Sequence, residues 1–317
     1  MLFNQGELQR LADAARSLSA VAGLTDVDLA EVRQSRQLAQ ETKAATAPLH
    51  ALLDFWRAMR WLLPGWPASD ARRLARLGDE AMRAALAEVL SPGRNLVELL
   101  TKGRMGGDGP GVSAANDLLQ RARELAAREG FFHWWTAFPT VFNAEGQGGF
   151  DVVLGNPPWD MLQMQEVEWF AERVPAIAAQ QRASDRKGLI AGLAKGQPEL
   201  WSEYLQACER AATEQRVVRL GADYPLMADG RNNLYKLFVE RATSIVSRDG
   251  LVALLTPSGI AADQGSAAFF RSISTTGRLG LLIDFENRGT FFPDVHDNFK
   301  FVALVFGGPG RQFGSTR

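Results

Sequence analysis

The sequence predicts an α/β protein in which a helical region precedes a mixed, mostly parallel β-sheet. Residues 1–130 repeat apolar side chains at helical spacing. From Phe131 onward, short apolar runs alternate with helical patterns, which is typical of an open α/β sheet. The last two apolar runs follow one another without a helical pattern between them. We therefore expect their strands to pair antiparallel, with such a strand at the edge of the sheet.

The helical region is expected to contain separate amphipathic segments divided by proline and glycine. These segments cover residues 7–24, 46–63, 68–90 and 114–130. A glycine-rich loop, residues 101–113, precedes the last of them, and Ser113 is expected to cap that helix.

Four apolar runs are expected to form the strands, at residues 150–155, 251–257, 278–286 and 300–307. The first run is apolar almost throughout, so we expect a strand that is buried on both faces. Helical patterns at residues 201–215 and 232–250 lie between the first two strands. The second of these ends on Asp249-Gly250, a typical end of a helix.

Composition and charge narrow the classes of function. The chain has 317 residues, 46% of them hydrophobic and 22% charged, with a net charge of −1. A net charge so close to zero excludes a positive electrostatic potential over the whole surface. A surface that binds nucleic acid therefore has to be local or lie on another chain. A single cysteine, Cys208, excludes an internal disulfide. The three histidines, His50, His133 and His296, are scattered and predict no metal site.

The lack of a recognisable targeting signal in this sequence leads us to expect a cytoplasmic protein. The first residues are polar and charged where a signal peptide has an apolar core. No apolar run approaches the length of a membrane span, so no membrane partner is expected.

The most informative stretch is Asn156-Pro157-Pro158-Trp159, which directly follows the first predicted strand. In open α/β sheets, ligands bind outside the carboxyl ends of the strands. The two prolines fix the backbone and leave carbonyl acceptors, to which Asn156 adds a side-chain oxygen. Converging acceptors beside an aromatic ring suit an extruded adenine, whose stacking is worth about 1–3 kcal/mol. The alternative is a plain strand-exit turn with Trp159 packed back on the core.

The stretch GFDVVLGNPPW resembles the catalytic motif of amino-methylating DNA methyltransferases. Further segments resemble the large adenine-specific methylases of bacterial phage defence, that is, type IIG restriction–modification enzymes and BREX- and DISARM-type methylases. These segments are residues 156–178, 224–242, 250–265 and 282–306. The resemblance covers about Phe131 to Phe306. Residues 1–130 resemble, more weakly, an insert that such proteins carry ahead of the motif.

The resemblance implies a partial Rossmann-like methyltransferase sheet in residues 131–308, followed by a tail in residues 309–317. It implies transfer of a methyl group from S-adenosylmethionine to the N6 amine of a flipped adenine in double-stranded DNA, within a restriction–modification or phage-defence system. Asn156 and the carbonyl of Pro157 would bind the amine, and Trp159 would stack on the base.

Further residues are implied less directly. Phe292 or Phe299 would form a second aromatic wall, with a core position as the equally weighted alternative. Tyr235 falls in a segment that lines the base pocket, but core packing is the better interpretation. The residues that would line the cleft are Asp160, Gln163 and Gln165.

The pattern is incomplete in one respect. Such enzymes bind S-adenosylmethionine on a glycine-rich turn after an earlier strand, and residues 1–149 contain no such strand and turn. Residues 103–111 have the glycines but follow a helical pattern. No cofactor-binding residue is assigned, and Asp151 and Asn156 are merely adjacent. We therefore expect a chain that is inactive alone, or that completes its site with a missing N-terminal methylase half and a DNA-recognition domain or subunit.

Other functions are weaker candidates. A nuclease is rejected because the acidic residues and Lys300 crowd into one loop, where Asn298 takes an acidic position. Ser258 lacks the glycines of a nucleophile elbow. The main competitor is a non-catalytic fragment or subunit that binds nucleic acid or a partner protein through the basic segment 71–86, although a solvated helix face is the usual explanation of such a pattern. Binding of S-adenosylmethionine distinguishes these two classes.

Overall fold

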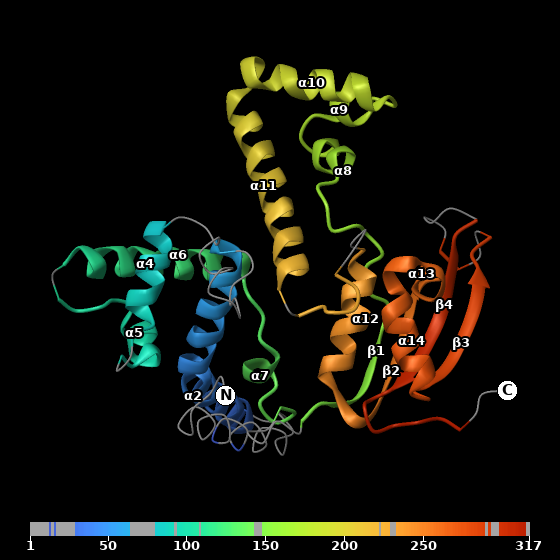
Figure 1. Cartoon of the computed structure of the whole chain (residues 1–317), viewed down its shortest axis with the longest axis horizontal. Helices are drawn as coiled ribbons and strands as arrows, with labels where there is room; N and C mark the ends of the chain where they lie inside the picture. Colours follow the sequence, from blue (N-terminus) through green and yellow to red (C-terminus); the bar gives the residue numbers. More distant parts are fainter. Residues whose placement is uncertain are drawn as a thin grey trace.

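A computed structural model describes most of the chain as a group of helices that lies beside a region with one four-stranded sheet (Figure 1). The described residues are 13, 16, 29–63, 80–91, 94–107, 109–142, 148–221, 223–228, 233–288, 291–292 and 298–314. The helix expected over residues 7–24 lies almost entirely outside this part of the chain. The same holds for the start of the helix expected over residues 68–90.

Helices α2, α4, α5 and α6 pack on one another around an apolar core. Their bounds are α2 Leu29–Leu62, α4 Glu80–Val89, α5 Leu96–Lys102 and α6 Pro110–Glu129. Side chains such as Phe55, Met59 and Leu119 are buried between them because apolar residues recur along one face of each helix. The expectation that Ser113 caps α6 is wrong. The helix begins earlier, at Pro110, where the fixed φ of proline suits the first helical position.

Helices α8 to α11 form an excursion that rises away from the sheet (Figure 1). Their bounds are α8 Glu166–Ala171, α9 Pro175–Ala178, α10 Ala183–Gly196 and α11 Pro198–Leu220. They have a small core of their own, in which Phe170, Ile190 and Tyr204 are buried. The helix predicted over residues 201–215 is confirmed as the central part of α11.

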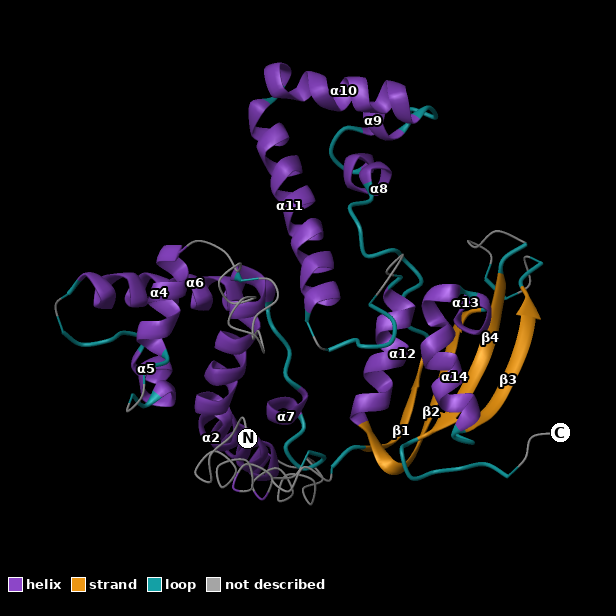
Figure 2. Cartoon of the chain, viewed as in Figure 1, coloured by secondary structure: helices purple, strands orange, loops and turns teal. Residues whose placement is uncertain are grey.

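The sheet has four strands in the order β1-β2-β4-β3 within the described chain (Figure 2). Their bounds are β1 Phe150–Gly155, β2 Val246–Pro257, β3 Leu279–Glu286 and β4 Lys300–Gly307. Strands β1 and β2 pair parallel, whereas β4 pairs antiparallel with both β2 and β3. Three strands therefore run in one direction and the last runs against them. The four predicted strands and the antiparallel pairing of the last two are confirmed.

One face of the sheet carries helices. They are α12 Leu234–Ile245, α13 Gly259–Ala262 and α14 Ala267–Thr275, with the single turn η1 Gln264–Ser266 between the last two. Figure 2 shows these helices lying against the strands. Val252, Leu254, Leu304 and Phe306 point into this layer and are buried in one cluster with Phe269 of α14. This layer is the core of the strand region.

Three sequence expectations about these elements are wrong. Strand β1 is not buried on both faces, since Val152 and Leu154 are 58% and 78% exposed at an edge of the sheet. Strand β4 is not an edge strand, because it lies between β2 and β3. The helix expected over residues 232–250 ends at Ile245, and the following residues begin β2. In each case long-range strand pairing overrides a local pattern.

An ion-pair group fastens the helical region to the segment before α12. Arg57 and Arg60 of α2 both pair with Asp223, the former at 2.6 Å. Burial raises the pKa of Asp223, but the hydrogen bond from Arg60 and the charges of Arg57 and Arg60 outweigh it, and the net pKa is lowered. The carboxylate therefore stabilises the fold above its ordinary pKa, and this contribution disappears as the pH falls through the folded-state pKa.

We expect Asp223→Asn to lower the free energy of unfolding by roughly 1 kcal/mol at neutral pH, because the pair is partly solvated. Urea unfolding at about pH 7 and about pH 3 checks this, since the difference from the parent chain should shrink at the lower pH. Glu209→Gln is the matched control, because Glu209 pairs with Arg216 on an exposed helix face. A loss for Asp223→Asn that stays equal at both pH values would contradict the assignment.

Candidate functional site

Several loops meet at one end of the sheet, where the carboxyl ends of three strands lie. Because β1 and β2 are parallel, their carboxyl ends, at Gly155 and Pro257, lie at this same end. Strand β3 runs in the same direction, so the loop after Glu286 also starts there. Ser258 donates its backbone N–H to the carbonyl of Lys300 at 3.1 Å. Three connecting segments therefore lie together at the carboxyl ends of the strands: the Asn156–Trp159 turn, the turn after β2 and the loop between β3 and β4.

The turn itself is held by α12. The backbone N–H of Leu234, at the start of this helix, donates to the carbonyl of Asp160 at 2.8 Å. Met161 and Asn233 form an isolated antiparallel bridge next to it. Within the turn, Pro157 is buried while Asn156 and Pro158 are exposed. The Asn156 amide is thus presented at the carboxyl end of β1 on a backbone that is fixed on both sides.

Trp159 lies in an aromatic cluster with Phe292, Phe299 and Phe301. Its ring stacks on Phe299 with centroids 5.4 Å apart and an interplanar angle of 10°. Phe292 meets it edge-on at 5.3 Å, and Phe301 lies 6.0 Å away. A base held between two rings needs about 7 Å between them, twice the contact distance of carbon atoms. The Trp159–Phe299 pair is therefore closed, and a base can enter between the rings only if they separate.

Asn287 is a site residue that the sequence analysis missed. It directly follows β3, and it is fully buried. Its side chain accepts from the backbone N–H of Phe292 at 3.0 Å and donates to the Phe292 carbonyl at 2.9 Å. Its own N–H donates to the carbonyl of Phe299 at 3.0 Å. Asn287 therefore fixes both phenylalanines beside Trp159. An asparagine directly after a predicted strand, as at Asn156, was the signal available in the sequence.

Tyr235 occupies a different environment from the turn. It is 1% exposed and belongs to the core cluster under the sheet. Burial raises the pKa of its hydroxyl, with a further contribution from the charge of Asp263. Its neighbour Lys236 is also buried and pairs with Asp263 at 3.0 Å. Tyr235 is thus a packing residue of α12 in this structure.

The other candidates remain near the surface. Asp151 on β1 is exposed, as are Asp160 and Gln163, and Gln165 is half-buried at the start of α8. Downstream, the carboxylate of Glu240 accepts from the backbone N–H groups of Leu226 and Met227 at 2.8 and 2.9 Å. This contact fixes the segment that leads toward α12.

The glycine-rich loop does not fit a cofactor turn. The stretch 103–111 runs from the end of α5 into the first turn of α6, which begins at Pro110, and the described residues ahead of β1 contain no strand. Gly103 ends α5 with φ 82°, and a Cβ there would lie 2.0 Å from the guanidinium of Arg123. Arg123 donates to the carbonyls of Gly103 and Leu100 at 3.1 and 2.8 Å. These contacts give the loop a packing role, and the described residues ahead of β1 supply no strand–turn–helix cradle for S-adenosylmethionine.

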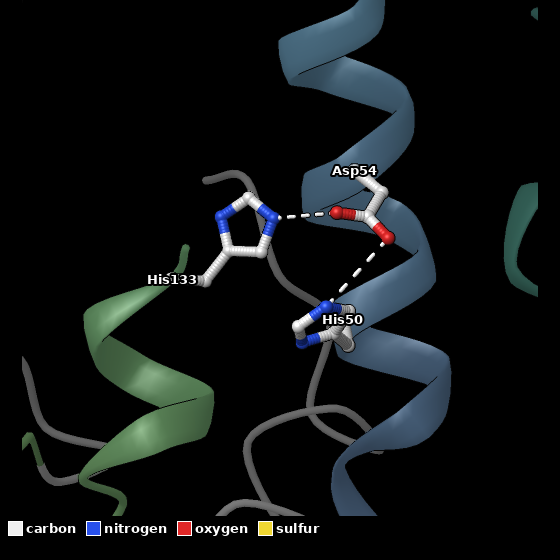
Figure 3. A group of neighbouring side chains, drawn as sticks. All are labelled: His50, Asp54 and His133. Atoms are coloured by element: carbon white, nitrogen blue, oxygen red, sulfur yellow. Dashed lines mark hydrogen bonds and ion pairs between the residues drawn. The ribbon is translucent and has the colours of Figure 1, made fainter. Parts of the chain in front are cut away.

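Two of the three histidines lie close together in space, whereas the sequence suggested that they are scattered. His50 and Asp54 of α2 lie beside His133, which immediately precedes α7 Trp134–Ala137 (Figure 3). Their candidate ligand atoms all lie within 4.8 Å of one another. The expectation of no metal site rested on that scatter, so this grouping removes the reason for it, while the expectation itself stays a prediction.

No helix in the described part of the chain has both the length and the apolar character required to cross a membrane.

One part of the chain matches a known protein family. Residues 102–185 match the family model of the Eco57I restriction-modification methylase. The matched segment includes α6, β1 and the whole Asn156–Trp159 turn. It starts within the helical region, where the sequence resemblance is weak, and it ends well before Phe306. Searches of curated proteins and of solved structures return no significant match. The match supports a restriction-modification methylase family for this part of the chain.

Proposed function

We propose that this chain is the base-binding part of a DNA methyltransferase that modifies the N6 amine of adenine in a restriction–modification or phage-defence system, with S-adenosylmethionine as methyl donor. The observation that carries the proposal is the Asn156–Trp159 turn. It lies at the carboxyl end of β1, within the segment that matches the methylase family. Methylases of this kind use S-adenosylmethionine in general, and the adenine specificity is our inference from the turn.

The chemistry assigned to the chain is recognition and orientation. The amide oxygen of Asn156 and the carbonyl of Pro157 accept the two hydrogens of the adenine amine. They fix the direction of the nitrogen lone pair, and they stabilise the positive charge that develops on the nitrogen as the N–C bond forms and the C–S bond of the donor breaks, before one amine proton is released to solvent. Trp159 offers a ring face for stacking once the closed aromatic pair with Phe299 has opened. The chain needs no covalent intermediate for this role.

Two exposed features of the sheet, the unpaired edge of β1 and one uncovered face, support a second polypeptide segment as partner. Strand β1 has an unpaired edge in the described structure, and such an edge is a template for another strand. The sheet face opposite α12 and α14 is apolar and largely uncovered. The exposed fractions are 58% for Val152, 78% for Leu154, 45% for Leu281 and 43% for Ile283. We propose that the half of the methylase that binds the cofactor pairs with β1 and covers this face, and that a DNA-recognition domain or subunit joins them on double-stranded DNA.

The function is tested on tagged chain isolated from the cells that encode it. The preparation is incubated with unmodified DNA and radiolabelled S-adenosylmethionine, and the labelled nucleoside is identified. We expect N6-methyladenine. Labelled N4-methylcytosine would overturn the base assignment. No label, together with retention of DNA by the chain, would instead favour the non-catalytic nucleic-acid-binding alternative. Calorimetric titration of the chain alone with S-adenosylmethionine is expected to show no micromolar binding.

Leu154→Lys tests the proposed partner. The side chain is exposed, so the free energy of unfolding of the chain alone should change by less than about 0.5 kcal/mol. Methylation by the preparation from cells should be lost, because a charge is buried in the partner contact. Val167→Lys, at an exposed position of α8, is the matched control and should leave methylation intact. Equal activity of both variants would refute a partner on this face.

A further inference from the structure

We propose that His50, Asp54 and His133 form a binding site for a zinc ion that joins the helical region to the segment leading into the sheet. His50 and Asp54 lie one turn apart on α2, so their side chains share one face of the helix. His133 approaches them from the start of α7 (Figure 3). The ligand set would be two imidazole nitrogens and one carboxylate oxygen. This set favours zinc over magnesium and calcium, because those two ions prefer ligand sets made of oxygen atoms alone.

The distances are close to those of a tetrahedral site. With zinc–ligand bonds of about 2.0–2.1 Å, neighbouring ligand atoms lie about 3.3 Å apart. His133 Nε2 is 2.9 Å from Asp54 Oδ1, and His50 Nε2 is 3.6 Å from Asp54 Oδ2. The candidate atoms all fall within 4.8 Å of one another. These two distances go to different oxygens of the Asp54 carboxylate, so closing three corners of the tetrahedron on one oxygen requires the rings and the carboxylate to rotate toward a common ion.

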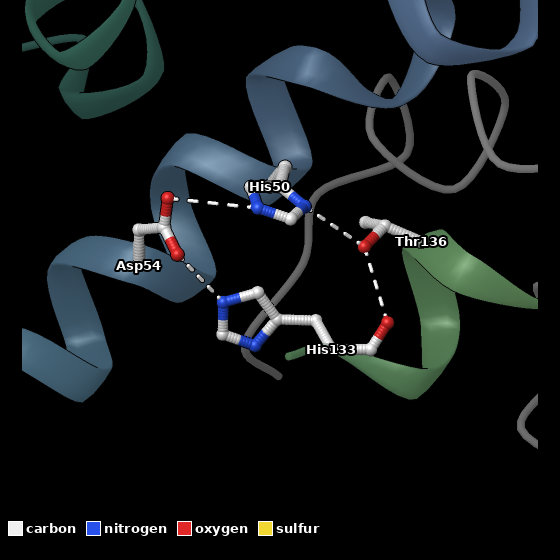
Figure 4. Close-up of polar contacts among 4 residues, drawn as sticks. All are labelled: His50, Asp54, His133 and Thr136. Atoms are coloured by element: carbon white, nitrogen blue, oxygen red, sulfur yellow. Dashed lines mark hydrogen bonds and ion pairs between the residues drawn. The ribbon is translucent and has the colours of Figure 1, made fainter. Parts of the chain in front are cut away.

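Thr136 supplies the outer contact that orients a zinc-binding histidine. Its hydroxyl lies 3.2 Å from the carbonyl of His133, to which it donates, and 3.0 Å from His50 Nδ1 (Figure 4). In the tautomer that carries its proton on Nδ1, His50 donates to this hydroxyl, and its lone pair at Nε2 faces the Asp54 carboxylate. Two acceptors that face each other need a cation or a proton between them. A histidine whose second nitrogen is held in this way is the usual arrangement around protein-bound zinc.

The surroundings allow an ion and a water molecule to enter. The side chains of His50, Asp54 and His133 are 45%, 27% and 10% exposed. A cavity of about 420 Å³, lined in part by His50, Asp54 and Phe131, lies next to them. The fourth ligand would be water from this cavity.

The position suggests what the ion does. Directly after His133, Trp134 lies 5.7 Å from Phe150, the first residue of β1, in an edge-to-face contact. A zinc ion between α2 and His133 would thus hold the helical region against the entry to the strand that carries the Asn156–Trp159 turn. This role is structural, and it adds a second attachment beside the Asp223 ion pairs.

The test uses the full 317-residue chain after treatment with a chelator. Zinc is titrated against a competing chromophoric chelator, and thermal unfolding is followed with and without zinc. We expect one zinc ion per chain, bound with a dissociation constant of about 1 µM or tighter, and a higher Tm with zinc. His133→Gln and Asp54→Asn should each weaken binding by at least about 100-fold, because a ligand is lost. Thr136→Val should weaken it by about 10- to 100-fold while all three ligands remain.

His296→Gln is the matched control, since it removes the third histidine of the sequence. It should leave zinc affinity unchanged. Cobalt in place of zinc should give the visible absorption of a tetrahedral site in the parent chain and not in His133→Gln. Absence of stoichiometric binding would overturn the proposal and leave a hydrogen-bonded cluster only. Equal affinity of the His133→Gln and His296→Gln variants would place the ion elsewhere and would also overturn it. If Asp54→Asn fails to fold, Thr136→Val still decides the question.

Discussion

Asn156→Ala is expected to lower the rate of adenine methylation by about 100- to 1,000-fold in the preparation isolated from cells. The side chain is exposed at the end of β1, so its removal leaves the fold intact but deletes one of two acceptors for the amine. Loss of one preorganised polar contact at a reacting group has an effect of this size in enzymes that work by electrostatic stabilisation. The measurement is the initial rate of label incorporation into DNA at saturating DNA.

Two comparisons make this result specific. Gln206→Ala, on the exposed surface of α11, should retain the parent rate. The unfolding midpoint of Asn156→Ala in urea should match that of the parent chain, since a surface change away from packing contacts costs little. A rate within about twofold of the parent would show that Asn156 does not hold the amine, because even a weak hydrogen bond, worth about 0.5 kcal/mol, exceeds that factor when it is lost. The plain strand-exit interpretation of the turn would then be preferred.

Leu254→Ala is expected to destabilise the chain by about 2–5 kcal/mol, the largest stability effect predicted here. Leu254 is 7% exposed and packs under α12 and α14 in the main cluster. Its neighbour Leu255 is an ideal comparison, because it has the same side chain on the same strand and points to the opposite, largely uncovered face. For Leu255→Ala we expect the free energy of unfolding to fall by only about 1 kcal/mol, because the Leu255 side chain buries less apolar surface on folding than the Leu254 side chain.

Urea unfolding of both variants measures the difference between the two faces. The same pair also reports on the proposed partner, because a segment that covers the open face buries Leu255 further. In the preparation from cells, Leu255→Ala should therefore lower the rate of methylation by more than the loss of stability measured for the isolated chain would account for. Equal destabilisation by both substitutions in the isolated chain would mean that the second face is already covered.

The sequence alone determined the strands and the position of the turn. All four predicted runs form strands, because short continuous apolar stretches bounded by turn residues favour buried or partly buried strands. These runs are 150–155, 251–257, 278–286 and 300–307. The antiparallel direction of the last strand followed from the missing helical pattern before it. The Asn156–Trp159 turn lies at a strand end for the same local reason, and the family match includes it.

Only the tertiary structure decided which neighbours these elements have. Strand β1 looks central by composition, yet it lies at an edge because no further described strand pairs with it. Asn287 holds Phe292 and Phe299 beside Trp159 through contacts that no spacing in the sequence reveals. His133 meets Asp54 across 79 positions of the chain.

The physical reason is the range of the interactions. Hydrophobic periodicity reports which face of an element is apolar, and it is fixed by residues a few positions apart. Strand order, the closed aromatic cluster and the histidine–aspartate group depend on pairings between distant segments. These pairings are selected by the packing of the whole chain, so they become visible only in three dimensions.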